Sequence, residues 1–381
     1  MAFNEFFRGR RVLVTGDTGF KGSWLSFWLK QLGAEVHGLA LDPETDPSNY
    51  ELLGLDREIA HRRVDIREFG ALREALSVIR PEIVFHLAAQ AIVRASYEQP
   101  VETLDANVMG TAHLLQSIRE AGFSADSPCT LILITSDKCY ENRESWDAYR
   151  ETDPMGGHDP YSMSKGAAEL VISAWRRSFF PPHACSSHGV SVASVRAGNV
   201  IGGGDWGPDR IVVDSVKALA SGETVGVRNP HAVRPWQHVL EPLSGYLWLA
   251  AEIGEAGGER PELRSGFNFG PGRDSERSVR ELVEALIKSW GSGSWRQVEK
   301  ERFSGLHEAT YLKLATDKAY HLLRWKPAWN FQTAVHETVA WYRHAYSGGF
   351  DTDAMRLFTR TQIESYTTAA ASQGLRWASR A

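Results

Sequence analysis

Cysteine is scarce in this sequence, with only Cys129, Cys139 and Cys185 among 381 residues. An odd and sparse set excludes a framework of disulfide bonds and is typical of proteins in a reducing compartment. We therefore expect a cytoplasmic protein.

Excess positive charge and long apolar segments are also absent. A net charge of -5 leaves no surplus of basic residues for nucleic acid to bind. No segment reaches the roughly 18 uncharged apolar residues of a membrane-spanning helix. The N-terminal stretch MAFNEFFRGRRVLVTG lacks the apolar core of a signal peptide. We expect neither a nucleic-acid partner nor a membrane partner.

Short apolar runs alternate with amphipathic segments through the first half of the chain. Strands are predicted at 11–16, 35–41, 82–89, 130–136 and 190–196. Helical periodicity is present between them, at 24–32, 72–79 and 114–118. Apolar strands alternating with helices predict an α/β fold of the Rossmann type, a doubly wound parallel sheet covered on both faces.

The composition changes after residue 197, where GNVIGGGDWGPDR and VRNPHAVRPWQHV are rich in glycine, proline and arginine. This change predicts a second, smaller domain beside the sheet. We assign residues 1–196 to the Rossmann domain, with about 232–269 returning to it. The second domain then comprises 197–231 and 270–381, interleaved with the first. The last ten residues are weakly hydrophobic and are expected to be mobile.

A glycine-rich loop, TGDTGFKG (15–22), joins the first predicted strand to the first predicted helix. Its glycines let backbone amides approach a pyrophosphate at a helix N-terminus. Asp42, after the second strand, would bind ribose hydroxyls and repel a 2′-phosphate, which favours NAD over NADP. An ordinary strand-to-helix turn is the alternative. The predicted cofactor site comprises Gly16, Thr18, Gly19, Phe20, Gly22, Asp42, Asp65, Ile66, Ala88 and Lys165.

The stretch DPYSMSKGAAEL (159–170) predicts a catalytic helix that begins at Pro160. Tyr161 and Lys165 are four residues apart and share one face of it. A lysine beside the phenol lowers the phenol's pKa, and Ser136 at the end of the central strand would bring a hydroxyl next to Tyr161. Together the three residues form a proton relay for oxidising an alcohol with NAD. Alone, this spacing also describes a solvated helix face.

At these motifs the sequence resembles the extended short-chain dehydrogenase/reductase family, and within it the sugar nucleotide dehydratases. The resemblance covers nearly the whole chain. It is carried by TGFKGSWLSFWL, HLAAQAIVRASYEQP, NVMGTAHLL, TSDKCYENRE, YRETDPMGGHDPYSMSKGAAELV, ASVRAGNVIGGGDW, RPWQHVLEPLSGYLWLA, FNFGP and HEATYLKL. It implies a Rossmann domain with a smaller nucleotide-sugar-binding domain, NAD as cofactor, and a nucleotide sugar, CDP-glucose, as substrate.

The resemblance also implies roles for the charged pair that follows Ser136. Lys138 is expected to remove the proton from carbon 5 of an oxidised sugar, and Asp137 to protonate the departing 6-hydroxyl. The two should titrate as a unit. An exposed charge pair on a loop is the alternative interpretation of these two residues.

Residues further along the chain complete the expected substrate site. Asn199, Arg210 and Arg234 fit nucleotide-sugar recognition, because an arginine fork binds a diphosphate bidentately. As in the family, helices near 98–121 and 161–180 are expected to form the face of a homodimer. The base cytidine rests on resemblance alone.

Several histidines and tryptophans have simpler interpretations. His183, Cys185 and His188 offer a zinc site without a fourth ligand, so no metal is expected. Trp24 and Trp28 favour core packing, and His231 and His238 favour structural roles.

Two other functions remain open on this scaffold. A UDP-sugar 4-epimerase needs serine, tyrosine and lysine but no elimination base, which Asp137 and Lys138 argue against. A non-enzymatic NAD-sensing regulator would lack the relay or the sugar pocket.

Asp17 departs from the loop usual in the apparent family, which has histidine there. A carboxylate pointing at a pyrophosphate about 6 Å away would repel it by about 3 kcal/mol at an effective dielectric of 20. Loose NAD binding, tightened by Asp17→His, would follow. Alternatively, Asp17 caps amides of its own loop and points away from the phosphates.

Overall fold

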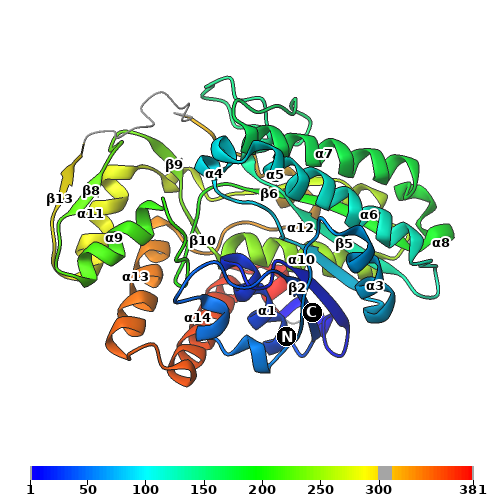
Figure 1. Cartoon of the computed structure of the whole chain (residues 1–381), viewed down its shortest axis with the longest axis horizontal. Helices are drawn as coiled ribbons and strands as arrows, with labels where there is room; N and C mark the ends of the chain where they lie inside the picture. The colour runs from blue at the N-terminus through cyan, green and yellow to red at the C-terminus, as the bar shows by residue number, and fades with distance from the viewer. Residues whose placement is uncertain (1, 299–310, 380–381) are drawn as a thin grey trace.

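A seven-stranded parallel sheet forms the centre of the computed structural model, which describes residues 2–298 and 311–379 (Figure 1). The strand order is β11-β6-β5-β4-β1-β2-β3, and each neighbouring pair is parallel. The strands are β1 (Arg11–Thr15), β2 (Glu35–Ala40), β3 (Ala60–Arg63), β4 (Ile83–His86), β5 (Cys129–Ile134), β6 (Val190–Ala197) and β11 (Gly266–Phe269).

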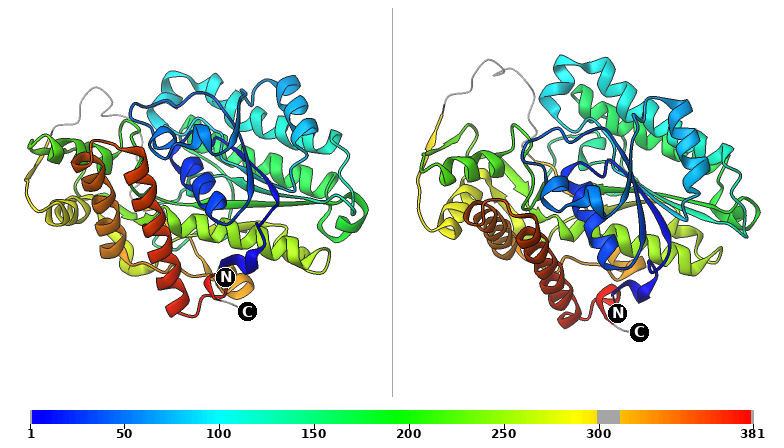
Figure 2. Two further views of the ribbon diagram at one scale, coloured as in Figure 1. Left: turned by 90° about the horizontal axis from the view of Figure 1, so that it is seen from below. Right: turned by 60° about the horizontal axis from the view of Figure 1, so that its bottom comes forward.

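Helices cover both faces of this sheet (Figure 2). On one face, buried leucines of the strands pack against α3 (Phe69–Ile79), α6 (Gly110–Glu120) and α7 (Pro160–Ser178). On the other face, α1 (Phe20–Gln31) and α10 (Leu240–Ala256) bury Trp24, Trp28 and Leu247. The predicted doubly wound Rossmann fold is confirmed, and Trp24 and Trp28 are core residues.

A second group of elements is joined to the sheet by short strand pairs. Figure 1 shows α9, α11 and α13 together beside the sheet. Its helices are α9 (Ile211–Ala220), α11 (Val279–Trp290) and α13 (Phe331–Ser347), whereas α12 (Asp317–Leu323) packs against β11 and α10 of the first group. Its strand pairs are β7 (Val200–Ile201) with β10 (Gln237–His238), β9 (Val233–Pro235) with β12 (Glu276–Ser278), and β8 (Val225–Val227) with β13 (Trp295–Gln297).

Short elements complete the described chain. The helices are α2 (Asn49–Leu52), α4 (Val93–Glu98), α5 (Pro100–Leu104) and α8 (Cys185–His188), with a π-helical segment η3 (Asp105–Met109) between α5 and α6. The 3-10 turns are η1 (Ala2–Glu5), η2 (Leu55–Arg57), η4 (Asp137–Cys139), η5 (Pro182–Ala184), η6 (Pro261–Leu263), η7 (Arg273–Ser275) and η8 (Arg376–Ala378).

The C-terminal segment packs against the N-terminus of the chain. Helix α14 (Thr352–Ser372) contacts α1 and α2, and η8 contacts η1. Trp377 is fully buried and stacks on Phe3, with ring centroids 5.0 Å apart. The expectation of a mobile tail is therefore wrong for residues 372–379, because a buried tryptophan removes a large apolar area from water.

The assignment of domains stays a proposal. Helix α10 and strand β11 pack with the sheet, as the returning segment 232–269 requires. However, α14 belongs by sequence to the proposed second domain and still contacts α1 and α2. Residues 299–310 of that domain, including the first four letters of HEATYLKL, lie outside the described residues.

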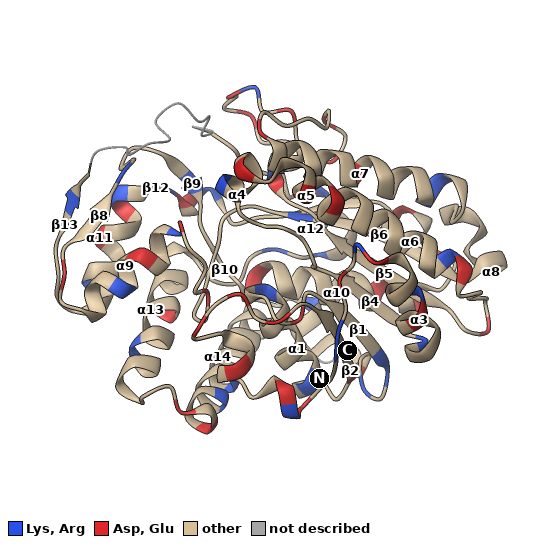
Figure 3. Ribbon diagram, in the orientation of Figure 1, with Lys and Arg blue, Asp and Glu red and all other residues tan. Residues whose placement is uncertain are grey.

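Charge is mixed over the molecule. Figure 3 shows acidic and basic positions interspersed along the same helices. Within residues 2–298 and 311–379, every helix is too short or too polar to cross a lipid bilayer.

Candidate active site

The glycine loop lies where β1 passes into α1, beside the end of β4. Gly16 has a positive φ of 76°, and a Cβ there would lie 2.7 Å from the backbone nitrogen of Ala88. A Cβ on Gly22 would lie 2.0 Å from the carbonyl oxygen of Gly16. Gly19 precedes α1 without any side-chain cap, so the first amides of the helix are left for another acceptor. This is the local geometry that a pyrophosphate requires.

Asp17 turns away from this cradle, toward the neighbouring strands. Its carboxylate is fully buried and accepts a 2.8 Å hydrogen bond from Nδ1 of His61 on β3. Gly38 on β2 makes room for it, because a Cβ there would lie 2.1 Å from Oδ2 of Asp17. The interpretation that Asp17 points away is supported, but its partner is His61 rather than amides of the loop. The repulsion argument loses its geometric basis.

The Asp17–His61 pair has one hydrogen bond and one unused acceptor. Oδ1 of Asp17 is buried and has no hydrogen-bond partner among the described residues. The hydrogen bond to Asp17 raises the pKa of His61, against the opposing effect of burial. The ring of Tyr50 packs on His61 at 5.5 Å between centroids. A protonated His61 would neutralise the aspartate beneath the loop.

The remaining predicted cofactor residues lie along the same edge of the sheet. The Thr18 hydroxyl donates to the Leu41 carbonyl at 3.0 Å and ties the loop to the end of β2. Asp42 is exposed and pairs with Arg63 at 2.8 Å. Asp65 binds Arg67, and this hydrogen bond lowers the pKa of Asp65. Ile66 is buried beside Gly110. The ring of Phe20 lies near Gly202, where a Cβ would come within 3.1 Å of the ring.

The five predicted catalytic side chains meet at the ends of β5 and α7. Ser136 follows β5, donates to Oδ1 of Asp137 at 2.9 Å and accepts the amide of Lys138 at 3.3 Å. Asp159 caps α7 by accepting the Ser162 amide, which fixes the first turn that carries Tyr161. The ammonium nitrogens of Lys138 and Lys165 lie 5.9 and 5.8 Å from the Tyr161 ring centroid.

Burial controls the ionisation of this cluster. It raises the pKa of Tyr161 to about 12, although the Ser136 hydrogen bond lowers it. It also raises the pKa of Asp137 and lowers that of Lys165 to about 8. For Tyr161, burial outweighs the Ser136 hydrogen bond and the charge of Arg210, which lower the pKa, so the lowering effect expected from Lys165 stays a prediction.

A buried ion pair lies directly under the catalytic residues. Glu169, one helical turn after Lys165, binds Nε and Nη2 of Arg196 at 2.8 and 2.9 Å. The hydroxyls of Thr135 and Ser194 also donate to it, at 2.6 and 2.8 Å. Burial alone would raise the pKa of Glu169, but Arg196 lowers it on balance. The pair thereby connects α7 to the ends of β5 and β6.

The predicted substrate residues lie on the second-domain side. Arg210 pairs with Asp205, with 3.3 Å between Nε and Oδ2. Arg234 lies on β9, and its charge lowers the pKa of Asp137 against the larger effect of burial. The carbonyl of Asn199 accepts the Gln237 amide at 3.1 Å. His238 is fully buried between Trp24 and Trp329, which agrees with a structural role, whereas His231 is exposed.

Lys21 is a site residue that sequence reasoning missed. It lies in the glycine loop, and burial lowers its pKa to about 8, with Arg210 adding to the decrease. The charges of Asp137 and Asp205 oppose that shift, so the side chain faces the same centre. The only signal was a lysine inside TGFKG, and a lysine at a helix N-terminus usually extends into water.

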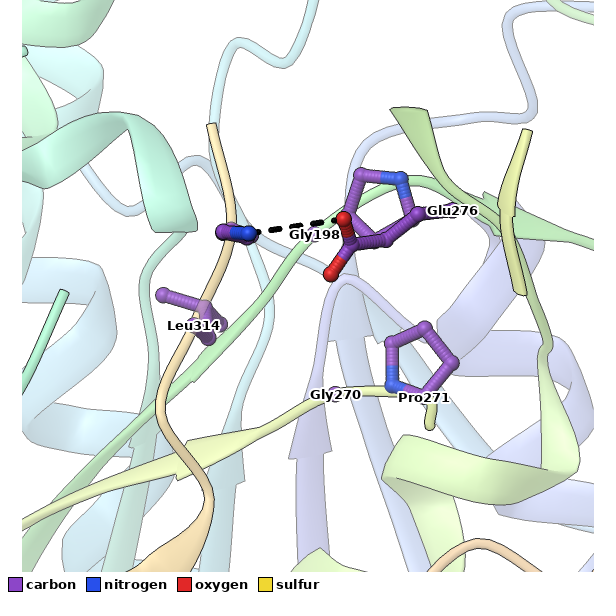
Figure 4. A pocket seen from close by; sticks show the side chains of 7 residues that line it. Gly198, Gly270, Pro271, Glu276 and Leu314 are labelled. Carbon is purple, nitrogen blue, oxygen red and sulfur yellow. Dashed lines mark hydrogen bonds and ion pairs between the residues drawn. The ribbon is translucent and has the colours of Figure 1, made fainter. Parts of the chain in front are cut away.

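A small pocket of about 20 Å³ adjoins Asp137, enough for a single water molecule. Figure 4 shows the Glu276 side chain at the pocket. Its carboxylate accepts a hydrogen bond from the Lys313 ammonium at 3.4 Å. A Cβ on Gly198, which lines the pocket, would lie 3.0 Å from Oδ2 of Asp137. Gly198 therefore borders both the pocket and the aspartate.

No group of three histidine, cysteine or acidic side chains within the described ranges could hold a metal ion. His188 instead accepts the Val190 amide at 3.1 Å, and Cys185 lies 3.4 Å from the Ser191 hydroxyl.

Comparison with known proteins identifies relatives along the whole chain. The family model described as GDP-mannose 4,6 dehydratase matches residues 13–338. CDP-glucose 4,6-dehydratase from Salmonella typhimurium is 46% identical over 369 residues, covering 97% of this chain and 99% of that protein.

Solved structures share the fold. The dTDP-glucose 4,6-dehydratase of Streptomyces venezuelae with NAD bound superimposes with a TM-score of 0.72 at 26% identity, covering 89% of this chain and 98% of that one. The UDP-glucose 4-epimerase of Thermotoga maritima gives 0.70 at 22% identity, covering 87% and 98%, a likeness of fold alone.

Proposed function

The chain belongs to the GDP-mannose 4,6-dehydratase family of extended short-chain dehydrogenases/reductases, and from this we propose that it is an NAD-dependent hydro-lyase acting on CDP-D-glucose. The products are CDP-4-dehydro-6-deoxy-D-glucose and water. The observation that carries this proposal is the near full-length likeness to the Salmonella CDP-glucose 4,6-dehydratase.

The glycine loop fits NAD. The loop brings its backbone close together at Gly16 and Gly22, where a side chain would not fit. With Gly19, these glycines leave room for a pyrophosphate at the start of α1. The cradle is bordered by Thr18, Phe20 and Ala88. Asp42 would bind the adenosine ribose. The adenine would contact Asp65 and Ile66. When bound, NAD accepts a hydride from carbon 4 of the sugar and returns it to carbon 6. Lys165 would hold the ribose next to the reacting centre.

Tyr161 and Ser136 serve the oxidation at carbon 4. The phenol of Tyr161 takes the proton of the 4-hydroxyl, and the Ser136 hydroxyl holds the phenol in place. The ketone that forms makes the proton on carbon 5 acidic. Lys138 removes that proton while Asp137 protonates the departing 6-hydroxyl, and the burial that raises the pKa of Asp137 supports its role as an acid.

Arg210, Arg234 and Asn199 would hold the nucleotide sugar. Both guanidinium groups act electrostatically on the catalytic cluster, Arg210 on Tyr161 and Arg234 on Asp137. A diphosphate bound by these arginines would leave the sugar facing Tyr161 and Asp137. The pocket beside Gly198 would lie next to the leaving 6-hydroxyl.

The test is to incubate purified protein and NAD with CDP-, UDP-, dTDP- and GDP-hexoses and follow the alkali-induced absorbance of a 4-keto product. We expect signal with CDP-glucose above the others. Signal with a different nucleotide would overturn the assignment of cytidine, and no 4-keto product from any of them would overturn the reaction.

The Asp137–Lys138 pair distinguishes this proposal from a UDP-sugar 4-epimerase. An epimerase returns the hydride to carbon 4 and needs no acid and base for elimination. A silent NAD-sensing regulator is disfavoured because the serine, tyrosine and lysine come together around one ring. The same assay separates these alternatives, since an epimerase yields no 4-keto product.

We also propose that the chain is a cytoplasmic homodimer. The helices expected at the dimer face carry exposed apolar side chains, namely Val101, Met109, Met163 and Leu170. Two copies of this surface would bury them in a bundle of α5, η3 and α7. Leu170→Glu should shift the mass in sedimentation equilibrium from dimer to monomer, and an unchanged mass would remove this face from the interface.

A further inference from the structure

Three side chains form a continuous hydrogen-bonded path through the active site. The Ser136 hydroxyl donates to Oδ1 of Asp137 at 2.9 Å and is also hydrogen-bonded to the Tyr161 phenol. All three residues are buried. In the roles proposed above, the path begins at Tyr161, which would face carbon 4 of the sugar. It ends at Asp137, which would face the 6-hydroxyl.

The proposed reaction needs one proton to travel in that direction. Oxidation frees the proton of the 4-hydroxyl, and the 6-hydroxyl must gain a proton to leave as water. The proton on carbon 5 is removed and later replaced, so it does not contribute. In each cycle, therefore, one proton disappears at the carbon 4 side and one is required at the carbon 6 side.

Tyr161 alone does not solve this problem. With a pKa of about 12, its phenol keeps its own proton near neutral pH and has no free site for another. Asp137 by itself would deliver one proton and then need another for the next cycle. A link between the two residues meets both needs.

We propose that Tyr161, Ser136 and Asp137 form a single proton relay that carries the proton of the 4-hydroxyl to the departing 6-hydroxyl; this rests on the proposed function. As the sugar's O–H bond at carbon 4 breaks, a new O–H bond forms on Tyr161. The phenol's original proton passes to Ser136, and that of Ser136 passes to the carboxylate of Asp137. Carbon 4 is oxidised, and its hydride reduces NAD.

Elimination then resets the relay. The C5–H bond breaks as Lys138 gains a proton, the C6–O bond breaks, and Asp137 gives its proton to the leaving oxygen to form water. Asp137 is again ionised and Tyr161 is again neutral. Lys138 returns its proton to carbon 5 as the hydride arrives at carbon 6. No proton is exchanged with the solvent at any step that the relay serves.

The surroundings of Asp137 suit a group that must be ionised at rest and protonated in mid-cycle. Burial favours its neutral form, while neighbouring cations favour the carboxylate. The titratable groups that face it are Lys138 and Cys139 on its own segment, Lys21 on α1, Tyr161 on α7, Arg234 on β9 and Tyr246 on α10.

The first experiment measures protons during one turnover. Protein loaded with NAD is mixed with CDP-glucose in weak buffer containing a pH indicator, and reduction is followed at the nicotinamide wavelength. We expect wild type to show reduction without proton release. Asp137→Asn and Ser136→Ala should release one proton per reduction, and Ser136→Thr, which keeps the hydroxyl, should behave as wild type. A proton released by wild type would overturn the relay, whereas absence of reduction in wild type would overturn the proposed function instead.

The pH profile of the oxidation step gives a second criterion. In wild type the rate should rise as Asp137 ionises and then level off. In Ser136→Ala the proton must leave Tyr161 directly, so the midpoint should move to higher pH by roughly two units or more. A variant that is merely less well packed would lose rate without this shift, and an unchanged midpoint would contradict the relay.

The third measurement needs neither cofactor nor substrate. Ionisation of Tyr161 is followed by ultraviolet difference spectroscopy, with Tyr161→Phe as the reference. Because the Asp137 charge raises the phenol's pKa, Asp137→Asn should lower it. An unchanged titration would mean that the two ends of the relay are not coupled.

Discussion

Two buried acid–base pairs lie along the same edge of the sheet and are built differently. Glu169 under the catalytic residues has both oxygens filled by Arg196, Thr135 and Ser194. Asp17 under the cofactor loop has one partner, His61, and one buried oxygen with no partner among the residues described. Arginine stays charged at any ordinary pH, so the fully hydrogen-bonded Glu169–Arg196 pair keeps its geometry. The strength of the Asp17–His61 pair depends on whether the histidine is protonated.

The difference follows what each end of the site is proposed to do. The catalytic end positions Tyr161 and Lys165 on α7 relative to Ser136 after β5, and small errors in such positions are costly in rate. The cofactor end needs only a loop of backbone amides at the start of α1. The contrast predicts that substitutions at the catalytic end have larger effects on stability and activity than substitutions at the cofactor end.

Breaking the saturated pair should have the largest effect on stability. Arg196→Leu leaves the Glu169 carboxylate buried without a cation, which typically costs about 3–5 kcal/mol. The midpoint of urea unfolding should fall accordingly, and the double variant with Glu169→Leu should recover much of the loss. If the single and double variants unfold alike, the pair is not the reason for the loss.

Removing the proposed elimination base should uncouple elimination from oxidation. Lys138→Ala should slow product formation by roughly a hundred- to ten-thousand-fold, the usual weight of a general base. Reduction of bound NAD should persist, because Tyr161, Ser136 and Lys165 remain. Rapid-mixing absorbance at the nicotinamide wavelength separates the two steps, and full turnover by the variant would exclude Lys138 from the mechanism. Binding of NAD by calorimetry should be unchanged.

The His61 pair should make stability depend on pH. The pKa of His61 is raised in the folded protein, so its contribution is complete below its unfolded pKa of about 6.5 and is lost as pH rises through the folded pKa. We expect stability to fall across that window, because the neutral imidazole binds the aspartate less strongly than the charged ring does. His61→Gln should flatten the dependence in thermal unfolding at graded pH. Equal slopes in both proteins would leave Asp17 and His61 uncoupled.

The Asp42–Arg63 pair supplies the exposed reference for both buried pairs. Because both side chains lie largely in water, Arg63→Ala should leave the midpoint of urea unfolding nearly unchanged. A loss as large as that of Arg196→Leu would mean that burial does not explain the contrast between the pairs.

Much of the fold was predictable from local pattern. The five predicted strands, the three helices between them and the helix that begins at Pro160 all form. Apolar periodicity reports which face of an element is buried. Strand β11 was not predicted as a strand, since Gly266–Phe269 is too short to show a period. The buried Trp377 was missed because a weakly hydrophobic tail gives no sign of a distant partner such as Phe3.

The sequence by itself determined which chemical groups the site contains. The glycine loop at 15–22, the Tyr161–Lys165 spacing and the run from Ser136 to Lys138 are local patterns, and a parallel sheet gathers strand ends at one edge. Tertiary structure alone decided how those groups ionise and where they point. Asp17 faces His61 across 44 positions of sequence, Lys21 faces Asp137, and burial raises the pKa of Tyr161 to about 12. Direction and desolvation depend on neighbours from distant segments, which no local pattern contains.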